Sequence, residues 1–214
     1  MIQLTILKIS GYGPWTLTLG SDREHALQML QASLYQKIQK LFSEKNCLVF
    51  LNRSDEFFVV SNGLNLEDHI EIQKNLENSF DMRLSMSIGC ADSPFDANLK
   101  AYEGKKNEIF LNKEFAIFGS INGHSEQQVS IMHFEVENLT SRRKKISPYE
   151  TTSIIFNLYA KMSKFFLQKN SLTFFMGGDN FMVVANDESK QSAKDFIKLI
   201  ENEDNITLNC GIGN

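Results

Sequence analysis

A run of four residues, Gly177–Asn180, has the residue types of a site that could hold a metal ion. Asp179 supplies a carboxylate, a preferred ligand of hard cations such as Mg2+, and the two glycines let the backbone approach a ligand closely. Ions bound in this way can neutralise a triphosphate and activate water. The run also lies between apolar segments, so a tight hairpin turn explains it equally well. The four residues alone leave both interpretations open.

The segments around this run occur twice in the chain. Three blocks recur in the same order, and a fixed offset is the mark of a duplicated unit. LVFLNRSDEFFVVSNG and LTFFMGGDNFMVVAND share seven identical positions. The blocks pair residues 48–63 with 172–187 and 84–89 with 208–213 at an offset of 124, and 3–10 with 128–135 at an offset of 125.

Each copy has the pattern of a strand, a helix, a two-stranded hairpin, a second helix and a last strand. Capping boxes at Ser21–Glu24 and Ser147–Glu150 mark the start of the first helix in each copy. Right-handed crossovers fold such a βαββαβ unit into an antiparallel sheet with both helices on one face. We therefore predict an α+β protein of two tandem ferredoxin-like units, residues 1–106 and 128–214, joined by a connector at 107–127.

A second carboxylate is expected beside Asp179. The first strand of a βαββαβ unit lies antiparallel to the third, so Glu135 at the end of one strand should lie next to the turn that opens the other. The loop after Glu135 leads to a helix N-terminus, which suits phosphate. The basic run Arg142–Lys145 in this loop is either a solvated surface or a phosphate contact.

The first copy differs at the corresponding positions. Asp55 keeps the hairpin acid, but the alignment pairs Ser10 with Glu135, and Arg53 stands in place of a glycine. A guanidinium in this position can hold an anion or simply neutralise Asp55 and Glu56.

Composition narrows the class of protein. The 214 residues are 42% hydrophobic and carry a net charge of -4, which fits a packed protein without a broad surface for nucleic acid. We expect no membrane span and a cytoplasmic location. The three cysteines and four histidines are scattered, so any metal should be bound by oxygen atoms.

The segments YGPWT (12–16), SMSIGCADSPFDA (85–97), ENLT (137–140) and GGDNFM (177–182) resemble archaeal GTP cyclohydrolase III, and the similarity runs along nearly the whole chain. The resemblance implies two palm domains related to nucleotidyl cyclases and GGDEF proteins. It also implies Mg2+-dependent hydrolysis of GTP, in which the imidazole ring opens at C8, the formyl group is retained and the triphosphate is cut to a monophosphate. The product is 2-amino-5-formylamino-6-ribosylamino-pyrimidinone 5'-monophosphate, with phosphate.

The resemblance also assigns roles to residues. It implies that Glu135 and Asp179 are catalytic and bind Mg2+, with the Val136 carbonyl as a further ligand and Asp55 as the metal-ligand candidate of the first copy. The implied substrate-binding residues are Gly177, Gly178 and Asn138 along the triphosphate, Asn180 at the hairpin or substrate, Arg53 as an anion contact, and Tyr12 on the base or in the core. A homo-oligomer is expected.

The chain departs from the family pattern, which has aspartate at the positions of Ser10 and Glu135. It is also expected to lack the helix that closes the second unit in the family. Two alternatives therefore stand beside the hydrolase: a palm-type nucleotidyl cyclase or transferase, and a non-catalytic guanine-nucleotide-binding relative. A cyclic or dinucleotide product would indicate the former, and Mg-GTP binding without product the latter.

Overall fold

The computed structural model describes residues 1–21, 23–121, 129–137, 146–186 and 190–213. Two compact units form, one from Met1–Asp92 with Asp96–Gln127 and the other from Ser93–Phe95 with Gln128–Asn214. In the described ranges, no helix has the length and apolar character needed to span a membrane.

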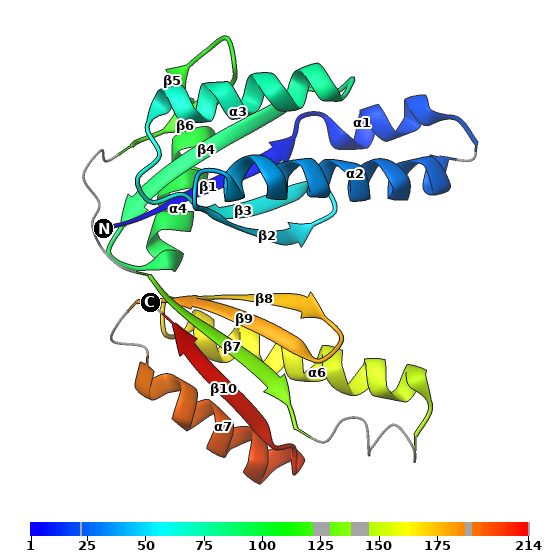
Figure 1. The fold of residues 1–214 in the computed structure, drawn as a ribbon, viewed down its shortest axis with the longest axis vertical. Helices are drawn as coiled ribbons and strands as arrows, with labels where there is room; N and C mark the ends of the chain where they lie inside the picture. Colours follow the sequence, from blue (N-terminus) through cyan, green and yellow to red (C-terminus); the bar gives the residue numbers. More distant parts are fainter. Residues whose placement is uncertain (22, 122–128, 138–145, 187–189, 214) are drawn as a thin grey trace. The chain divides into compact units, whose positions relative to one another are not determined.

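The first unit is built on a six-stranded sheet with strand order β2-β3-β1-β4-β6-β5 (Figure 1). Its elements are β1 (Ile2–Ile9), α1 (Tyr12–Thr16), η1 (Leu17–Leu19), α2 (Arg23–Ser43), β2 (Leu48–Arg53), β3 (Glu56–Val60), α3 (Leu66–Ser79), β4 (Leu84–Ala91), α4 (Pro94–Lys106), β5 (Phe110–Asn112) and β6 (Ile117–Gly119).

The second unit repeats the first four strands of that sheet in the same spatial order. Its strand order is β10-β7-β9-β8. The first strand of each unit therefore lies between the third and the fourth strand of that unit. This strand order agrees with the duplication predicted from the sequence. Its elements are β7 (Ser130–Val136), α6 (Pro148–Leu167), β8 (Leu172–Gly177), β9 (Asn180–Ala185), α7 (Lys190–Asp204) and β10 (Leu208–Gly213).

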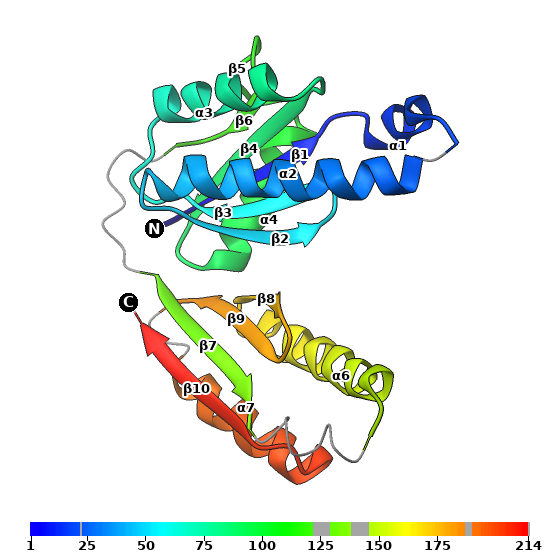
Figure 2. The same ribbon diagram turned by 45° about the vertical axis from the view of Figure 1, so that its right-hand side comes forward.

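The first unit departs from the expected antiparallel sheet with all helices on one face. The strands β5 and β6 come from the segment expected to connect the units, and β6 pairs parallel with β4. Helix α4 covers the face opposite α2 (Figures 1 and 2). It can approach because Gly89 of β4 has no side chain: a Cβ there would overlap the Ala97 carbonyl and the Ala101 amide of α4.

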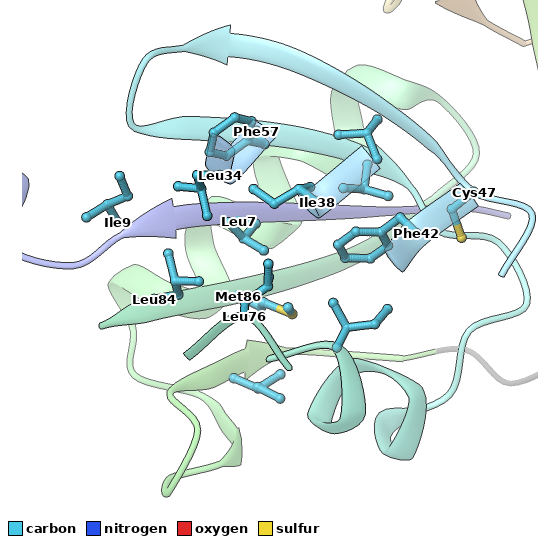
Figure 3. Close-up of a cluster of buried hydrophobic side chains, with 14 of the residues drawn as sticks. Leu7, Ile9, Leu34, Ile38, Phe42, Cys47, Phe57, Leu76, Leu84 and Met86 are labelled. Atoms are coloured by element: carbon cyan, nitrogen blue, oxygen red, sulfur yellow. The ribbon is translucent and has the colours of Figure 1, made fainter. Parts of the chain in front are cut away.

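Each unit has its own apolar core between the sheet and its paired helices. In the first unit, alternate residues of the strands point toward α2 and α3, as the two-residue period of a strand requires. Figure 3 shows this core, which includes Leu7, Ile9, Leu34, Ile38, Phe42, Phe57, Leu76, Leu84 and Met86.

The core of the second unit is rich in phenylalanine. The Phe134 ring of β7 packs 5.6 Å from Phe166 of α6 and 6.1 Å from Phe196 of α7, measured between ring centroids. All three rings are fully buried. Aromatic pairs at this spacing add to the stabilisation that comes from burying their area, so they fix both helices against the central strand.

A buried polar network joins the first strand of the chain to α3. The Asn65 carbonyl accepts a hydrogen bond from His69 Nδ1 at 2.6 Å, which leaves His69 Nε2 to accept one from the Thr5 hydroxyl at 2.9 Å. Thr5 also bonds the Ser61 hydroxyl at 2.8 Å. Because His69 is fully buried, burial lowers its pKa below the ordinary value of 6.5.

The close approach of α4 makes a prediction about Gly89. A Gly89→Ala substitution forces α4 away from β4 and should lower the free energy of unfolding by about 3 kcal/mol, the cost of an overpacked core. Thermal denaturation followed by circular dichroism measures the loss. Gly13→Ala is the matched control, because a Cβ at Gly13 meets nothing within 4 Å. Equal melting temperatures for the two variants would contradict the predicted contact.

The buried histidine makes a prediction about pH. Below about pH 6.5 the unfolded chain binds a proton at His69 that the folded chain does not, so stability should fall as the pH decreases through this range. The urea midpoint at pH 7.5, 6.5 and 5.5 tests this. The dependence of the urea midpoint on pH should be weaker in His69→Gln. It should be unchanged in His25→Gln, because His25 is exposed in the native protein. If the urea midpoint of His69→Gln depends on pH as steeply as that of the native protein, other groups cause the dependence.

Candidate active site

The hairpin between β8 and β9 depends on its two glycines. Gly177 and Gly178 adopt φ of 102° and 63°, in the left-handed region that side chains rarely enter. The first hairpin has the same register, with one extra residue before a two-residue turn, yet its Arg53 and Ser54 do not have positive φ. A tight hairpin of this register therefore forms without glycine, and the simple turn interpretation does not account for the glycine pair.

The strand register brings Glu135 to this hairpin. Glu135 of β7 pairs with Asn180, the residue after Asp179, so the register brings two acidic residues 44 positions apart in the sequence to the same hairpin. Glu135 is exposed and Asp179 half-buried. Among the residues that the structure describes, neither carboxylate has a cationic side chain as an ion-pair partner. An uncompensated carboxylate pair of this kind offers oxygen ligands to a hard cation.

Asn180 holds the Asp179 side chain in place. Its Nδ2 donates to Asp179 Oδ1 at 3.3 Å and lies 3.5 Å from the Gly177 carbonyl oxygen. The same side chain thus ties the carboxylate to the backbone of the glycine pair. We expected Asn180 either to support the hairpin or to contact the substrate, and these contacts agree with support of the hairpin.

The register corrects the alignment of the first strands. Lys8 pairs with Glu56 and Ser85, whereas Glu135 pairs with Asn180 and Asn209, the equivalents of those residues at an offset of 124. Lys8, and not Ser10, is therefore the counterpart of Glu135, at an offset of 127.

The backbone beyond the strand agrees with this correction. The Ser10 amide donates to the Arg83 carbonyl at 2.8 Å, and the Glu137 amide donates to the equivalent Thr207 carbonyl at 2.9 Å. Ser10 therefore corresponds to Glu137. The first unit has an ammonium where the second has the Glu135 carboxylate, and the serine is not the substitution that separates the two sites.

Cations surround the hairpin acids of the first unit. Lys8 Nζ lies 3.8 Å from Asp55 Oδ2 and 3.5 Å from Glu56 Oε2, and Arg53 Nη2 lies 3.0 Å from Glu56 Oε2. Burial acts to raise the pKa of Glu56, but hydrogen bonds from Asn52 and Arg53 and the nearby cationic charges outweigh it and lower that pKa. We expected Arg53 either to hold an anion or to neutralise Asp55 and Glu56, and these contacts agree with neutralisation. Metal binding at Asp55 stays a prediction.

A cavity of about 460 Å3 lies on the helix side of the second hairpin. The predicted capping box is present at its edge, where Ser147 Oγ accepts from the Glu150 amide at 3.2 Å and Glu150 Oε2 accepts from the Ser147 amide at 2.7 Å. Gly178 belongs to both the hairpin and the cavity. The lining is otherwise made by Pro148, Thr151, Thr152, Ile155, Phe156 and Phe175.

The remaining predicted residues are placed as follows. The Val136 side chain is buried in the core. Tyr12 accepts a hydrogen bond from Gln31 Nε2 at 2.6 Å and packs against the first core, the second of its two expected roles. Burial, followed by the charge of Asp55, raises the pKa of Tyr12. Asn138 and Arg142–Lys145 lie outside the described residues.

Some lining residues of this cavity were not found from the sequence. Thr151, Thr152 and Phe156 stand on the first turns of α6, where the sequence shows an apolar helix stripe but not which side of it borders a hollow. Phe156 is 53% exposed, and this figure separates it from the core aromatics that it resembles in the sequence.

These features define a class of protein: tandem βαββαβ units, one of which has two acidic residues at its hairpin without cationic partners among the described residues. A family model for GTP cyclohydrolase III matches residues 1–214. The chain belongs to the GTP cyclohydrolase III family.

Curated relatives agree with this family. The GTP cyclohydrolase III of Methanothermobacter thermautotrophicus is 37% identical over 100% of this chain and 87% of the relative. The protein of the same name from Methanocaldococcus jannaschii is 32% identical over 100% of this chain and 81% of the relative. A bacterial light-regulated adenylyl cyclase has a TM-score of 0.37 and 10% identity, over 99% of this chain and 72% of that one; similarity of this degree does not establish a shared function.

Proposed function

We propose that this chain is a GTP hydrolase whose reaction takes place at the hairpin of the second unit. The observation that carries the proposal is the pairing of Glu135 with Asn180, because it brings Glu135 to the strand position next to the turn that holds Asp179. Within the described part of that unit, neither carboxylate has a cationic partner. The family of the chain supplies the substrate: its relatives are named for action on GTP. A nucleoside triphosphate is an anion, so a carboxylate pair can hold it only through a cation.

Mg2+ fits this donor set. Glu135 and Asp179 are hard oxygen donors, and the Val136 carbonyl is a third candidate between them and the following loop. The described residues contain no cluster of three or more metal-binding side chains, so phosphate and water oxygens would complete the coordination. Bound there, Mg2+ would neutralise phosphate charge and lower the pKa of a water molecule.

The protein's own groups would bind and orient the nucleotide. Gly177 and Gly178 present backbone without side chains to the phosphates, and Asn180 keeps the Asp179 carboxylate turned toward the hairpin. Asn138 is outside the described residues, and we assign it to the phosphates on the family resemblance alone. The cavity beside Gly178 is within the usual size range for a small ligand, and its Phe156 and Phe175 offer apolar rings to a purine.

The reaction that we infer consumes three waters. One water adds at C8 of the guanine and the C8–N9 bond breaks, which leaves the formyl group on N7 and a proton on N9. Two further waters cleave the two phosphoanhydride bonds, giving the formylamino-pyrimidine ribonucleotide monophosphate and two phosphates. Glutamate is one methylene longer than the family's aspartate, so Glu135 reaches further from the strand to the same ion.

Mass analysis of products tests the activity. The native chain, incubated with GTP and Mg2+, should yield a nucleotide that has gained one water and lost two phosphates. Asp179→Asn should lower the rate about 100-fold or more, because even residues that only orient metal ligands are worth 10–100-fold. Asp195→Asn, an exposed acid on α7 of the same unit, should leave the rate unchanged.

The other outcomes identify the alternatives. A cyclic nucleotide or a dinucleotide would indicate a cyclase or transferase. Unchanged GTP, together with Mg-dependent binding that Asp179→Asn abolishes, would indicate a non-catalytic nucleotide-binding protein. Either result contradicts the proposed reaction.

A separate measurement tests the metal. Glu135→Lys gives the second unit the residue that the first unit has at the equivalent position, so the ammonium should pair with Asp179 and take the place of the cation. The rise in melting temperature on adding Mg2+ with GTP should disappear in Glu135→Lys and persist in Asp195→Asn. A native Mg-dependent shift in Glu135→Lys would show that the ion binds elsewhere.

A further inference from the structure

The first unit has a second cavity at the place where its sheet corresponds to the carboxylate pair of the other unit. It has a volume of about 490 Å3 and lies on the face of the sheet covered by α4. Basic side chains predominate in its lining. The lining residues are Ile6, Lys8, Arg53, Glu56, Ser87, Tyr102, Lys105 and Lys106.

The cavity carries an excess of positive charge. Its four cationic side chains face two carboxylates, those of Glu56 and the adjoining Asp55, and both carboxylates pair with Lys8 and Arg53. Four positive charges less two negative charges leave a surplus of two. Lys105 and Lys106 form no ion pair with a carboxylate within the described ranges of the chain.

Lys105 is a half-buried cation. Its Nζ donates to Ser85 Oγ at 2.6 Å, a neutral partner. Burial, and then the charge of Lys8, lower its pKa and outweigh the opposite effect of the Glu56 carboxylate, so its surroundings disfavour the ammonium. A bound anion would relieve this cost.

The cationic groups are held by a rigid contact. Lys105 and Lys106 follow Gly104 on α4, and a Cβ at Gly104 would lie 2.5 Å from the Gly119 Cα of β6. The helix and the edge of the sheet are thus in backbone contact directly beside the two lysines. The side chains that line the cavity stand on packed elements, as a preformed binding site requires.

We propose that this cavity binds a polyphosphate-bearing anion without a metal ion. Lys8, at the position equivalent to Glu135, puts a fixed positive charge where the second unit has a carboxylate. Arg53 pairs with Glu56 through Nη2, and its planar guanidinium has further donors for phosphate oxygens. A surplus of two charges matches a diphosphate or triphosphate better than a monoanion.

An exposed aromatic ring at the cavity suits a nucleotide as the carrier of this anion. Tyr102 is 57% exposed, and Lys106 Nζ lies 5.9 Å from its ring centroid. A base could stack on the free face of this ring. The site belongs entirely to the first unit, so the proposal does not depend on the reaction assigned to the second.

Calorimetric titration with sodium pyrophosphate in excess EDTA tests the site. The titrated protein is the full chain carrying Asp179→Asn. EDTA removes divalent cations and the substitution removes a proposed metal ligand, so the second unit should not bind pyrophosphate through a metal ion. One equivalent of pyrophosphate should bind per chain. Lys105→Met and Lys106→Gln should each weaken binding at least about tenfold, whereas Lys40→Gln, an exposed lysine on α2, should leave it unchanged.

The substitution at Lys106 keeps the test decisive if Lys105→Met fails to fold, because Lys106 is exposed. Absence of saturable binding, or equal binding by the Lys106→Gln and Lys40→Gln proteins, would overturn the proposal.

A second titration, with GTP in EDTA, distinguishes a nucleotide from a free polyphosphate as the natural ligand. Tighter binding than pyrophosphate, lost in Tyr102→Ala, would identify a nucleotide site. Equal affinity for both would identify a site for the free polyphosphate. Both results support a metal-independent polyphosphate site.

Discussion

The pairing of the first strand of each unit with the third is the constraint on which the rest of the molecule depends. Because side chains alternate along a strand, the register that buries Leu7 and Ile9 also places Lys8 on the opposite face beside Glu56. The same register in the second unit buries Phe134 and Val136 and places Glu135 beside Asn180. A slip of one residue would exchange core and site in either copy.

Much of this arrangement could be predicted from the sequence. The recurrence of Asp55 at Asp179, with phenylalanine and valine around both, was sufficient to find the two hairpins and to predict the strand order. The capping box at Ser147 was sufficient to place the start of α6. These features are local, because each depends on residues that are close in the chain and on a pattern that no distant contact needs to complete.

The register of β1 could not be predicted from the sequence, and neither could the cavity beside α4 in the first unit. A shift of two residues keeps each residue on the same face of a strand, so Leu7 and Ile9 align with apolar residues at either offset: Met132 and Phe134 at 125, and Phe134 and Val136 at 127. The matching glutamines at 3 and 128 favoured the former, and only the pairing partners of Lys8 decide the question. The strands β5 and β6 have three residues each, too few to show a period, and without β6 the contact between Gly104 and Gly119 cannot be foreseen.

Lys8 gives the first unit a counter-ion that is tethered to the chain. Its ammonium stands 3.8 Å from Asp55, whereas Glu135 and Asp179 have no cationic partner in the described part of the second unit, and it cannot diffuse away when the concentration of divalent cations falls. If the second unit holds Mg2+ as proposed, the two copies should respond unequally to magnesium depletion: the hairpin acids of the first remain neutralised, while Glu135 and Asp179 of the second lose their counter-ion. On this proposal, the duplication combines one domain that is sensitive to the ionic composition of its surroundings with another that is indifferent to it.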